Sequence, residues 1–408
     1  MLDIKFIREN LKVVKDSAIA KGFDISFLDD LVACDEERRS LIAQIDKLNS
    51  EKKNNTDREK GKEIKDSLKE KEERFREVLD KFEKLMLRVP NPSALDVKIG
   101  TEADNEIVKT WGTIPAFDFK IRDHVEIGEL TDSIDIERGT KVAQSGFYYL
   151  KNGGALLELA LVNYAMKKLV SKGFVPVITP NVAKEKSVVG CGYQARSDKE
   201  RQIYHIEGED LDLIGTAEIT LMGMHSDEVL NGSELPIKYA GFSYCYRTEA
   251  GSYGKDVRGI LRVHEFRKTE MVVICKPEES DIWHEKLREI EEEIWQELEI
   301  PYQVIKMASG DLGSAAARKY DIEAWMPSQN KYREVTSTSV TTDFQTRRLN
   351  IRAKINNETV YPHALNGTVF SGRPIIAIME NYQREDGSFE VPAVLRDFVG
   401  KDIIEIKK

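Results

Sequence analysis

The chain has 408 residues, which is more than one small core requires, and we expect two domains. Charged residues make up 32% and the formal net charge is −10, so an RNA partner would need a local basic patch. The four cysteines, Cys34, Cys191, Cys245 and Cys275, form no Cys-x-x-Cys pair, which argues against a cysteine zinc site and a disulfide framework. Because no stretch approaches the roughly 18 apolar residues of a membrane span, we expect a cytoplasmic protein with no membrane partner.

The first hundred residues predict a helical hairpin. Apolar residues step by three and four along two segments, as in paired helices: Leu31, Cys34, Leu41, Ile45 and Leu48, then Ile64, Leu68, Phe75, Val78, Phe82 and Leu85. A polar turn at 54–57 would join them, and the narrow apolar stripe suits one partner helix, so we expect an exposed antiparallel arm. Lysines near the turn, such as Lys52 and Lys60, fit either a solvated stalk or a surface that binds RNA phosphates.

A domain boundary is expected after this arm. Pro90 and Pro92 stop a helix and force extended backbone, which divides the chain into an arm of residues 1–100 and a second domain of residues 101–408. Residues 155–172 then predict a helix that is apolar on more than one face, followed by a short β-rich run at 173–180. Such a helix and strand are typical of a core.

Residues 215–218, Gly-Thr-Ala-Glu, indicate the start of a helix. Thr216 is a suitable N-cap and Glu218 would face the positive end of the helix dipole.

Residues 242–270 predict a β-hairpin. Runs rich in β-branched and aromatic residues at 242–248 and 260–270 flank a connection that contains Gly251, Gly254 and Gly259. Charged side chains crowd this hairpin, and strand neighbours cannot all face solvent, so some of them should line an anionic ligand: Arg247, Glu249, Lys255, Arg258, Arg262, Arg267 and Lys268. Glu270, close to Arg267 and Lys268 at the end of the second run, is typical of a surface ion pair.

Two later segments complete the pattern. Residues 333–339 predict a strand rich in hydroxyl groups, followed by the charged segment Asp343-Phe344-Gln345-Thr346-Arg347-Arg348. Pro374 and the apolar spacing after it predict a helix that begins near Arg373, where the helix dipole would favour a phosphate. No Gly-x-x-x-x-Gly-Lys-Ser/Thr loop and no Gly-x-Gly-x-x-Gly occurs, so the two common nucleotide-binding loops are excluded.

In their order, these blocks resemble the class II aminoacyl-tRNA synthetases. RTEAGS followed by VRGILRVHEF is similar to motif 2 of the seryl-tRNA synthetases in particular, residues 333–348 resemble their E-[IV]-S-S and D-F-Q-A-R-R, and residues 365–381 resemble motif 3. The resemblance implies an α+β fold, with an antiparallel-sheet catalytic domain preceded by a coiled-coil arm that binds tRNA. It also implies a homodimer that forms through residues 155–180.

The resemblance also implies the site residues. Arg247 and Arg373 would be catalytic. Serine would be bound by Thr216, Ala217, Glu218, Arg247, Glu270, Asn366 and Thr368, with Glu270 turned inward to accept the hydroxyl proton. ATP would be bound by Arg247, Thr248, Glu249, Arg258, Val263, Phe266, Glu334, Val335, Thr336, Ser337 and Arg373, with Mg²⁺ on Glu334 and Ser337. The chain departs from the family pattern at Thr336, Val340 and Val369-Phe370.

The implied activity is the activation of L-serine with ATP to seryl-adenylate, followed by transfer to the 3′ end of tRNA(Ser). Whether a selenocysteine tRNA is also served stays open. Two alternatives from other classes are a relative that acylates a carrier protein and a non-catalytic RNA-binding scaffold. The first would lack the arm, and the second would have lost Arg247, Glu334 or Arg373, all of which are present.

Overall fold

The computed structural model describes residues 1–193, 202–250 and 258–408, which form two compact units, 1–93 and 94–408. Gly251, Gly254 and Lys255 of the predicted hairpin connection lie outside the described residues. No helix within the described ranges combines the length and the apolar character needed to cross a membrane.

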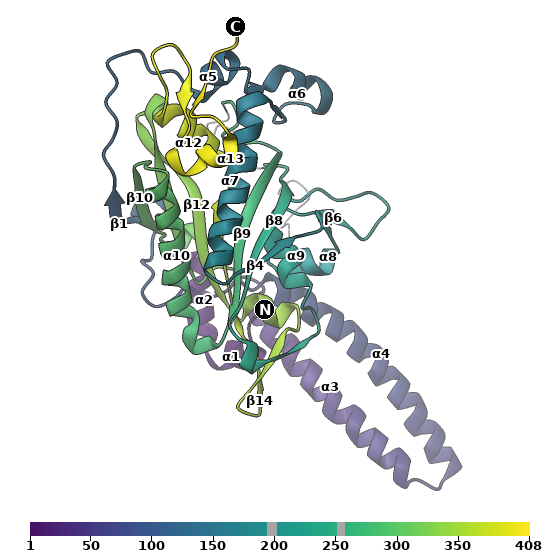
Figure 1. Cartoon of the computed structure of the whole chain (residues 1–408). Helices are drawn as coiled ribbons and strands as arrows, with labels where there is room; N and C mark the ends of the chain where they lie inside the picture. The colour runs from purple at the N-terminus through teal and green to yellow at the C-terminus, as the bar shows by residue number, and fades with distance from the viewer. Residues whose placement is uncertain (194–201, 251–257) are drawn as a thin grey trace. The chain divides into compact units, whose positions relative to one another are not determined.

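The first unit consists of helices and confirms the predicted hairpin. Its elements are α1 (Ile4–Glu9), α2 (Leu11–Ala20), α3 (Leu28–Asn54) and α4 (Arg58–Arg88). Figure 1 shows α3 and α4 lying side by side along their whole length, with the turn between them at the far end. Their contact stripe buries the expected apolar positions, Leu31, Cys34, Leu41, Ile64, Leu68, Val78 and Leu85. Asp57 caps α4 because its carboxylate accepts hydrogen bonds from the amides of Glu59 and Lys60.

The start of the chain also packs against this pair, which the periodicity did not predict. Ile7 of α1 and Val14 of α2 are buried in one cluster with Leu28 and Leu31 of α3. A fully buried carboxylate, Asp35, forms ion pairs with three arginines of α1 and α3, Arg8, Arg38 and Arg39. A buried charge is tolerated only when it is paired in this way.

The second unit is built on an eight-stranded sheet with the order β1-β10-β11-β12-β15-β9-β8-β4. Every neighbouring pair is antiparallel except β4 and β8, which run parallel. The strands are β1 (Glu106–Trp111), β4 (Val175–Ile178), β8 (Ile237–Tyr246), β9 (Glu265–Cys275), β10 (Tyr302–Lys306), β11 (Arg318–Met326), β12 (Lys331–Thr342) and β15 (His363–Phe370). This confirms the α+β class with an antiparallel sheet.

Helices α7 (Asn152–Ser171) and α10 (Ser280–Glu297) pack on one face of this sheet. Leu161 and Leu169 of α7 and Ile294 of α10 join the sheet residues Val273 and Ile322 in the main hydrophobic core. The other helices are α5 (His124–Leu130), α6 (Ile136–Ala143), α8 (Glu185–Gly190), α9 (Ala217–Gly223), α11 (Phe344–Arg348), α12 (Arg373–Asn381) and α13 (Arg396–Val399). All four cysteines are buried and free, as expected.

Small sheets complete the unit. In the three-stranded sheet, β13 (Arg352–Ile355) lies between β14 (Glu358–Val360) and β7 (Val229–Asn231). The two-stranded sheets pair β16 (Phe389–Glu390) with β17 (Ile403–Ile404), β2 (Ile134–Asp135) with β3 (Tyr149–Leu150), and β5 (Val182–Ala183) with β6 (Asp212–Leu213).

The hairpin differs from the prediction at both strands. β8 begins before residue 242, and β9 begins at Glu265 rather than at Ile260. The apolar residues Ile260 and Val263 are buried in the core without forming a strand, so their hydrophobicity reports burial and not β-structure. Since β9 continues to Cys275, Glu270 lies in the middle of the strand and not at its end.

His284 of α10 is a buried histidine at the contact between this helix and the sheet. The buried ring hydrogen bonds through Nε2 to the Thr338 carbonyl at 3.2 Å and stacks on Tyr320, and burial lowers its pKa from 6.5 to about 4. Between these pH values the unfolded chain binds a proton that the folded chain does not, so stability falls as the pH drops through this window.

We predict that His284→Phe, which preserves ring stacking, removes about 3 kcal/mol of acid destabilisation between pH 7 and pH 4. Thermal unfolding midpoints of both proteins across this range measure the difference. Parallel curves for the two proteins would contradict the prediction.

Candidate active site

The strand registers bring the predicted polar residues to one face of the sheet. Glu270 of β9 lies directly opposite Thr368 of β15, and Asn366 of β15 lies opposite Ser339 of β12. Further along β12, Ser337 lies opposite Asp321 of β11. Because directly opposed residues share a face, these side chains form one polar surface on the side away from α7 and α10.

Glu218 is the centre of one end of this surface. Thr216 caps α9 as predicted, since its hydroxyl accepts a hydrogen bond from the amide of Glu218 at 3.3 Å. The buried Glu218 carboxylate accepts hydrogen bonds from the side-chain amides of Asn366 at 2.6 Å and Gln345 at 2.7 Å, and from the Tyr193 hydroxyl at 3.3 Å. Burial raises the pKa of Glu218, which means that a cationic group beside it would be favoured.

The small residues Ala217 and Gly241 allow α9 to lie close to the sheet. Ala217 is fully buried, and a Cβ on Gly241 of β8 would lie 3.0 Å from the Ala217 Cβ. Gly241 is the β8 partner of Glu270. The glycine therefore lets α9 and Glu218 lie against the strand that carries Glu270.

Glu270 is 2% exposed, which excludes the alternative of a surface ion pair. Its carboxylate forms an ion pair with Lys268 at 2.7 Å and accepts a hydrogen bond from the Thr368 hydroxyl at 3.0 Å. Lys268 is itself buried. The inward direction that the resemblance implied is therefore the observed one.

The two predicted catalytic arginines border the polar surface, Arg247 directly after β8 and next to Gly215, and Arg373 beside Glu334 of β12. Nε and Nη2 of Arg247 both donate to the Gly215 carbonyl at 3.3 Å, and the guanidinium lies over the Phe266 ring, 5.2 Å from its centre. Arg373 is the first residue of α12, as predicted, and its Nη1 donates to the backbone carbonyl of Glu334 at 2.7 Å and to its carboxylate at 3.0 Å.

Electrostatics links the two arginines. Although partial removal from water opposes the shift of this half-exposed carboxylate, the positive charges of Arg373 and Lys319, with a smaller contribution from Arg247, hold the pKa of Glu334 well below its ordinary value. Arg247 and Arg373 therefore act on the same carboxylate. An anion with several oxygens, such as a polyphosphate, would be attracted to this cluster of cations.

Several other predicted ATP-binding residues form contacts within the protein. Glu249 forms an ion pair with Arg262, and Arg258 forms one with Asp123. The amide of Thr248 donates to the Gln202 carbonyl at 2.9 Å.

The remaining predicted ATP-binding residues differ in orientation. Val263 and Val335 are buried, and Ser337 lies on the polar face. The Thr336 hydroxyl donates to Glu291 of α10 at 3.1 Å on the opposite face, which leaves only the backbone of Thr336 for a nucleotide contact. The other departures from the family pattern, Val340, Val369 and Phe370, are buried in the main core.

The structure adds residues that the sequence reasoning missed. Tyr193 and Gln345 bind Glu218, and Lys319 pairs with Asp321 at 3.1 Å beside Ser337. Gln345 belongs to residues 343–348, which resemble the family's D-F-Q-A-R-R, but the sequence assigned it no role. Lys268, which the sequence already placed close to Glu270, lies two residues before it and so shares its strand face.

Comparison with known proteins agrees with this geometry. Residues 202–382 match the tRNA synthetase class II core domain (G, H, P, S and T), and residues 1–93 match the seryl-tRNA synthetase N-terminal domain. The chain is thus a class II aminoacyl-tRNA synthetase in its core. It is 45% identical to the serine–tRNA ligase of Dictyoglomus turgidum, with all of both chains covered.

Solved structures agree. The seryl-tRNA synthetase of Pyrococcus horikoshii, complexed with ATP, is 39% identical with a TM-score of 0.94 and 100% of both chains covered. The cytoplasmic serine–tRNA ligase of Naegleria fowleri, in complex with AMP, is 32% identical with a TM-score of 0.89, covering 100% of this chain and 99% of that one. This chain belongs to the seryl-tRNA synthetase family.

Proposed function

We propose that this protein activates L-serine with ATP to form seryl-adenylate and then transfers the seryl group to the 3′ end of tRNA(Ser). The observation that carries the proposal is the single polar face of the sheet. It places two buried carboxylates, Glu218 and Glu270, beside the cationic cluster of Arg247 and Arg373. The ammonium group of a small amino acid is complementary to the carboxylates, and the phosphates of a nucleoside triphosphate are complementary to the arginines.

Serine would lie over β9 and β15. Its ammonium group would approach Glu218, whose burial favours a positive neighbour, and its hydroxyl would replace or join the Thr368 hydroxyl at Glu270. The part of the face that binds serine is shaped by Thr216, Ala217 and Asn366. Arg247 would bind the carboxylate of the serine. An amino acid without the hydroxyl could not form this additional hydrogen bond to the buried Glu270, which supplies the discrimination.

ATP would lie across the cationic end. Arg247 is suited to the α-phosphate, Arg373 and Arg258 to the outer phosphates, and Phe266 to the adenine ring. The serine carboxylate is already ionised near neutral pH, so its attack on the α-phosphate needs no general base. The carboxylate oxygen forms a bond to phosphorus as the bond to pyrophosphate breaks, and the arginines stabilise the charge of the transition state.

Glu334 and Ser337 are suited to hold Mg²⁺. The low pKa of Glu334 keeps its carboxylate ionised, and Mg²⁺ prefers one or two protein oxygens together with phosphate oxygens. When bound, Mg²⁺ would neutralise phosphate charge. In this structure, Arg373 forms an ion pair with Glu334. When ATP binds, Arg373 would pair with a phosphate in place of that carboxylate.

The helical arm is the proposed contact for the tRNA. Its match to the seryl-tRNA synthetase N-terminal domain, together with the retained Arg247, Glu334 and Arg373, leaves the carrier-protein ligase and the scaffold without support. Both alternatives require one of these features to be missing.

A homodimer is proposed through α7 and β4. Leu159 of α7 is 61% exposed, and Ile178 of the edge strand β4 is 84% exposed. Further exposed apolar residues of the same two elements are Leu156, Val170 and Val175. A contiguous apolar edge of this kind is typical of an interface between identical subunits.

Arg247 provides the test of activation. We expect Arg247→Ala to lower kcat/KM in serine-dependent pyrophosphate exchange by about 100- to 1,000-fold, because it removes a charge that faces the transition state. Arg138→Ala, at an exposed arginine paired with Asp135, is the control. Unchanged exchange in Arg247→Ala would refute its role.

The arm can be shortened without disturbing its base. Cys34 contacts the Val78 carbonyl and Glu37 pairs with Arg74, so residues 42–70 can be replaced by a short turn that retains Asp35 and its arginines. We expect exchange to persist while tRNA(Ser) charging falls by at least about tenfold, since phosphate contacts are lost. Unaffected charging would show that the arm does not bind tRNA.

The dimer is tested by Ile178→Glu, which places a charge at the most exposed of these apolar residues. We expect the mass measured by light scattering to halve. Ile282→Glu, at a position of α10 that is 57% exposed, should leave the mass unchanged. A wild-type chain that is monomeric at micromolar concentration would contradict the proposal.

A further inference from the structure

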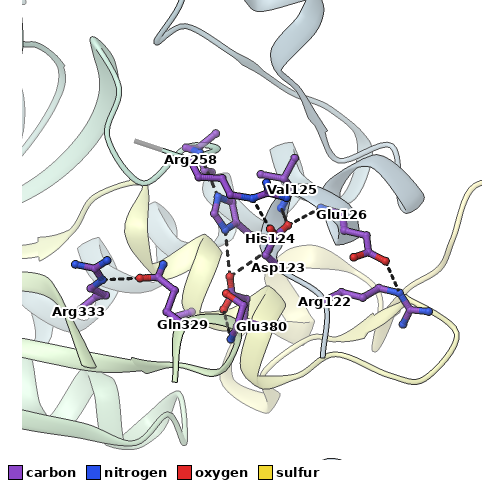
Figure 2. A network of polar contacts seen from close by, with 12 residues as sticks. Arg122, Asp123, His124, Val125, Glu126, Arg258, Gln329, Arg333 and Glu380 are labelled. Carbon is purple, nitrogen blue, oxygen red and sulfur yellow. Dashed lines mark hydrogen bonds and ion pairs between the residues drawn. The ribbon is translucent and has the colours of Figure 1, made fainter. Parts of the chain in front are cut away.

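A buried histidine joins three segments near the nucleotide end of the site. His124, the first residue of α5, is 2% exposed. Figure 2 shows its ring between Glu380 of α12 and the stretch that carries Arg258. We propose that His124 is a positioning residue that holds the turn Arg258-Gly259-Ile260 in place for the outer phosphates of ATP. This inference rests on the proposed function.

Both ring nitrogens of His124 are engaged. The amide of Ile260 donates to Nε2 at 3.2 Å, and Nδ1 lies 3.1 Å from a carboxylate oxygen of Glu380. A backbone amide can only donate, so Nε2 carries no proton, and the Nδ1 proton is directed at Glu380. The ring therefore works as a neutral bridge with a fixed orientation.

Glu380 anchors this bridge to α12. Its fully buried carboxylate also accepts hydrogen bonds from the backbone amides of His124 and Ser328, each at 3.1 Å. A carboxylate with several N–H donors is held firmly in place. Because α12 also begins with Arg373, one helix carries a phosphate-binding arginine and the support of His124.

The turn itself fits closely against His124. Gly259 has φ +67°, and a Cβ at this position would lie 2.0 Å from Nε2 of His124. Arg258 pairs with Asp123, the N-cap residue of α5, whose other oxygen accepts from the amides of Val125 and Glu126. Arg258 is thus attached on one side through Asp123 and on the other through Ile260 and His124.

The test compares two substitutions of the same residue. Glutamine carries its amide near the position of Nε2 and can accept from Ile260, whereas asparagine reaches only the position of Nδ1. We expect His124→Asn to raise KM for ATP about tenfold in pyrophosphate exchange, with KM for serine within about twofold of wild type. His124→Gln should recover most of the ATP affinity.

A second variant applies if His124→Asn does not fold. Gly259→Ala should push the turn away from His124 and raise KM for ATP in the same way. Gly400→Ala is the matched control, since Gly400 has φ +72° and a Cβ there would meet nothing within 4 Å. It carries the same backbone strain without the clash.

The outcomes separate this inference from the proposed function. Calorimetric titration of ATP without serine gives the affinity of each variant independently of turnover. Equal affinity in wild type, His124→Asn and Gly259→Ala would overturn the inference, as would equal effects of asparagine and glutamine. A wild-type protein that binds ATP yet shows no serine-dependent exchange would overturn the proposed function instead.

Discussion

The antiparallel pairing of β9, β15, β12 and β11 is the constraint on which the rest of the site depends. Pairing in register sends alternate residues to opposite faces, so one face collects Glu270, Thr368, Asn366 and Ser337 while the other packs on α7 and α10. A shift of one residue in any of these strands would move its polar groups into the core. The hydrophobic contact with the helices thereby also fixes the chemistry of the polar face.

The charges of this face are paired among themselves. Glu334 forms an ion pair with Arg373, and Glu270 forms one with Lys268. Such pairing limits the cost of removing charges from water, and under the proposed function substrates would bind by replacing these partners. Phosphates would take Arg373 from Glu334 and release that carboxylate for a cation. The charges are thus in place on the polar face before a substrate binds, which is the arrangement that electrostatic catalysis requires.

Helix α12 connects Arg373 with the residues that support His124. Arg373 begins the helix and Glu380 lies two turns further along, where it binds His124. One helix therefore carries Arg373 and also supports the turn of Arg258, the two residues proposed to meet the phosphates from different parts of the chain. The precision that transition-state stabilisation needs is supplied by such supports rather than by the arginines alone.

The sequence by itself determined the local features. Heptad spacing predicted α3 and α4, Thr216 predicted a helix start, and Pro374 placed the beginning of α12, because each depends on neighbours within a few turns. Resemblance supplied Arg247, Glu334 and Arg373 as candidates. Only the tertiary structure decided that Glu270 is buried with Lys268, that Tyr193 and Gln345 hold Glu218, and that His124 meets Glu380, 256 residues away. Strand register and long-range packing bring these groups together, and no local pattern records which distant donor will satisfy a buried carboxylate.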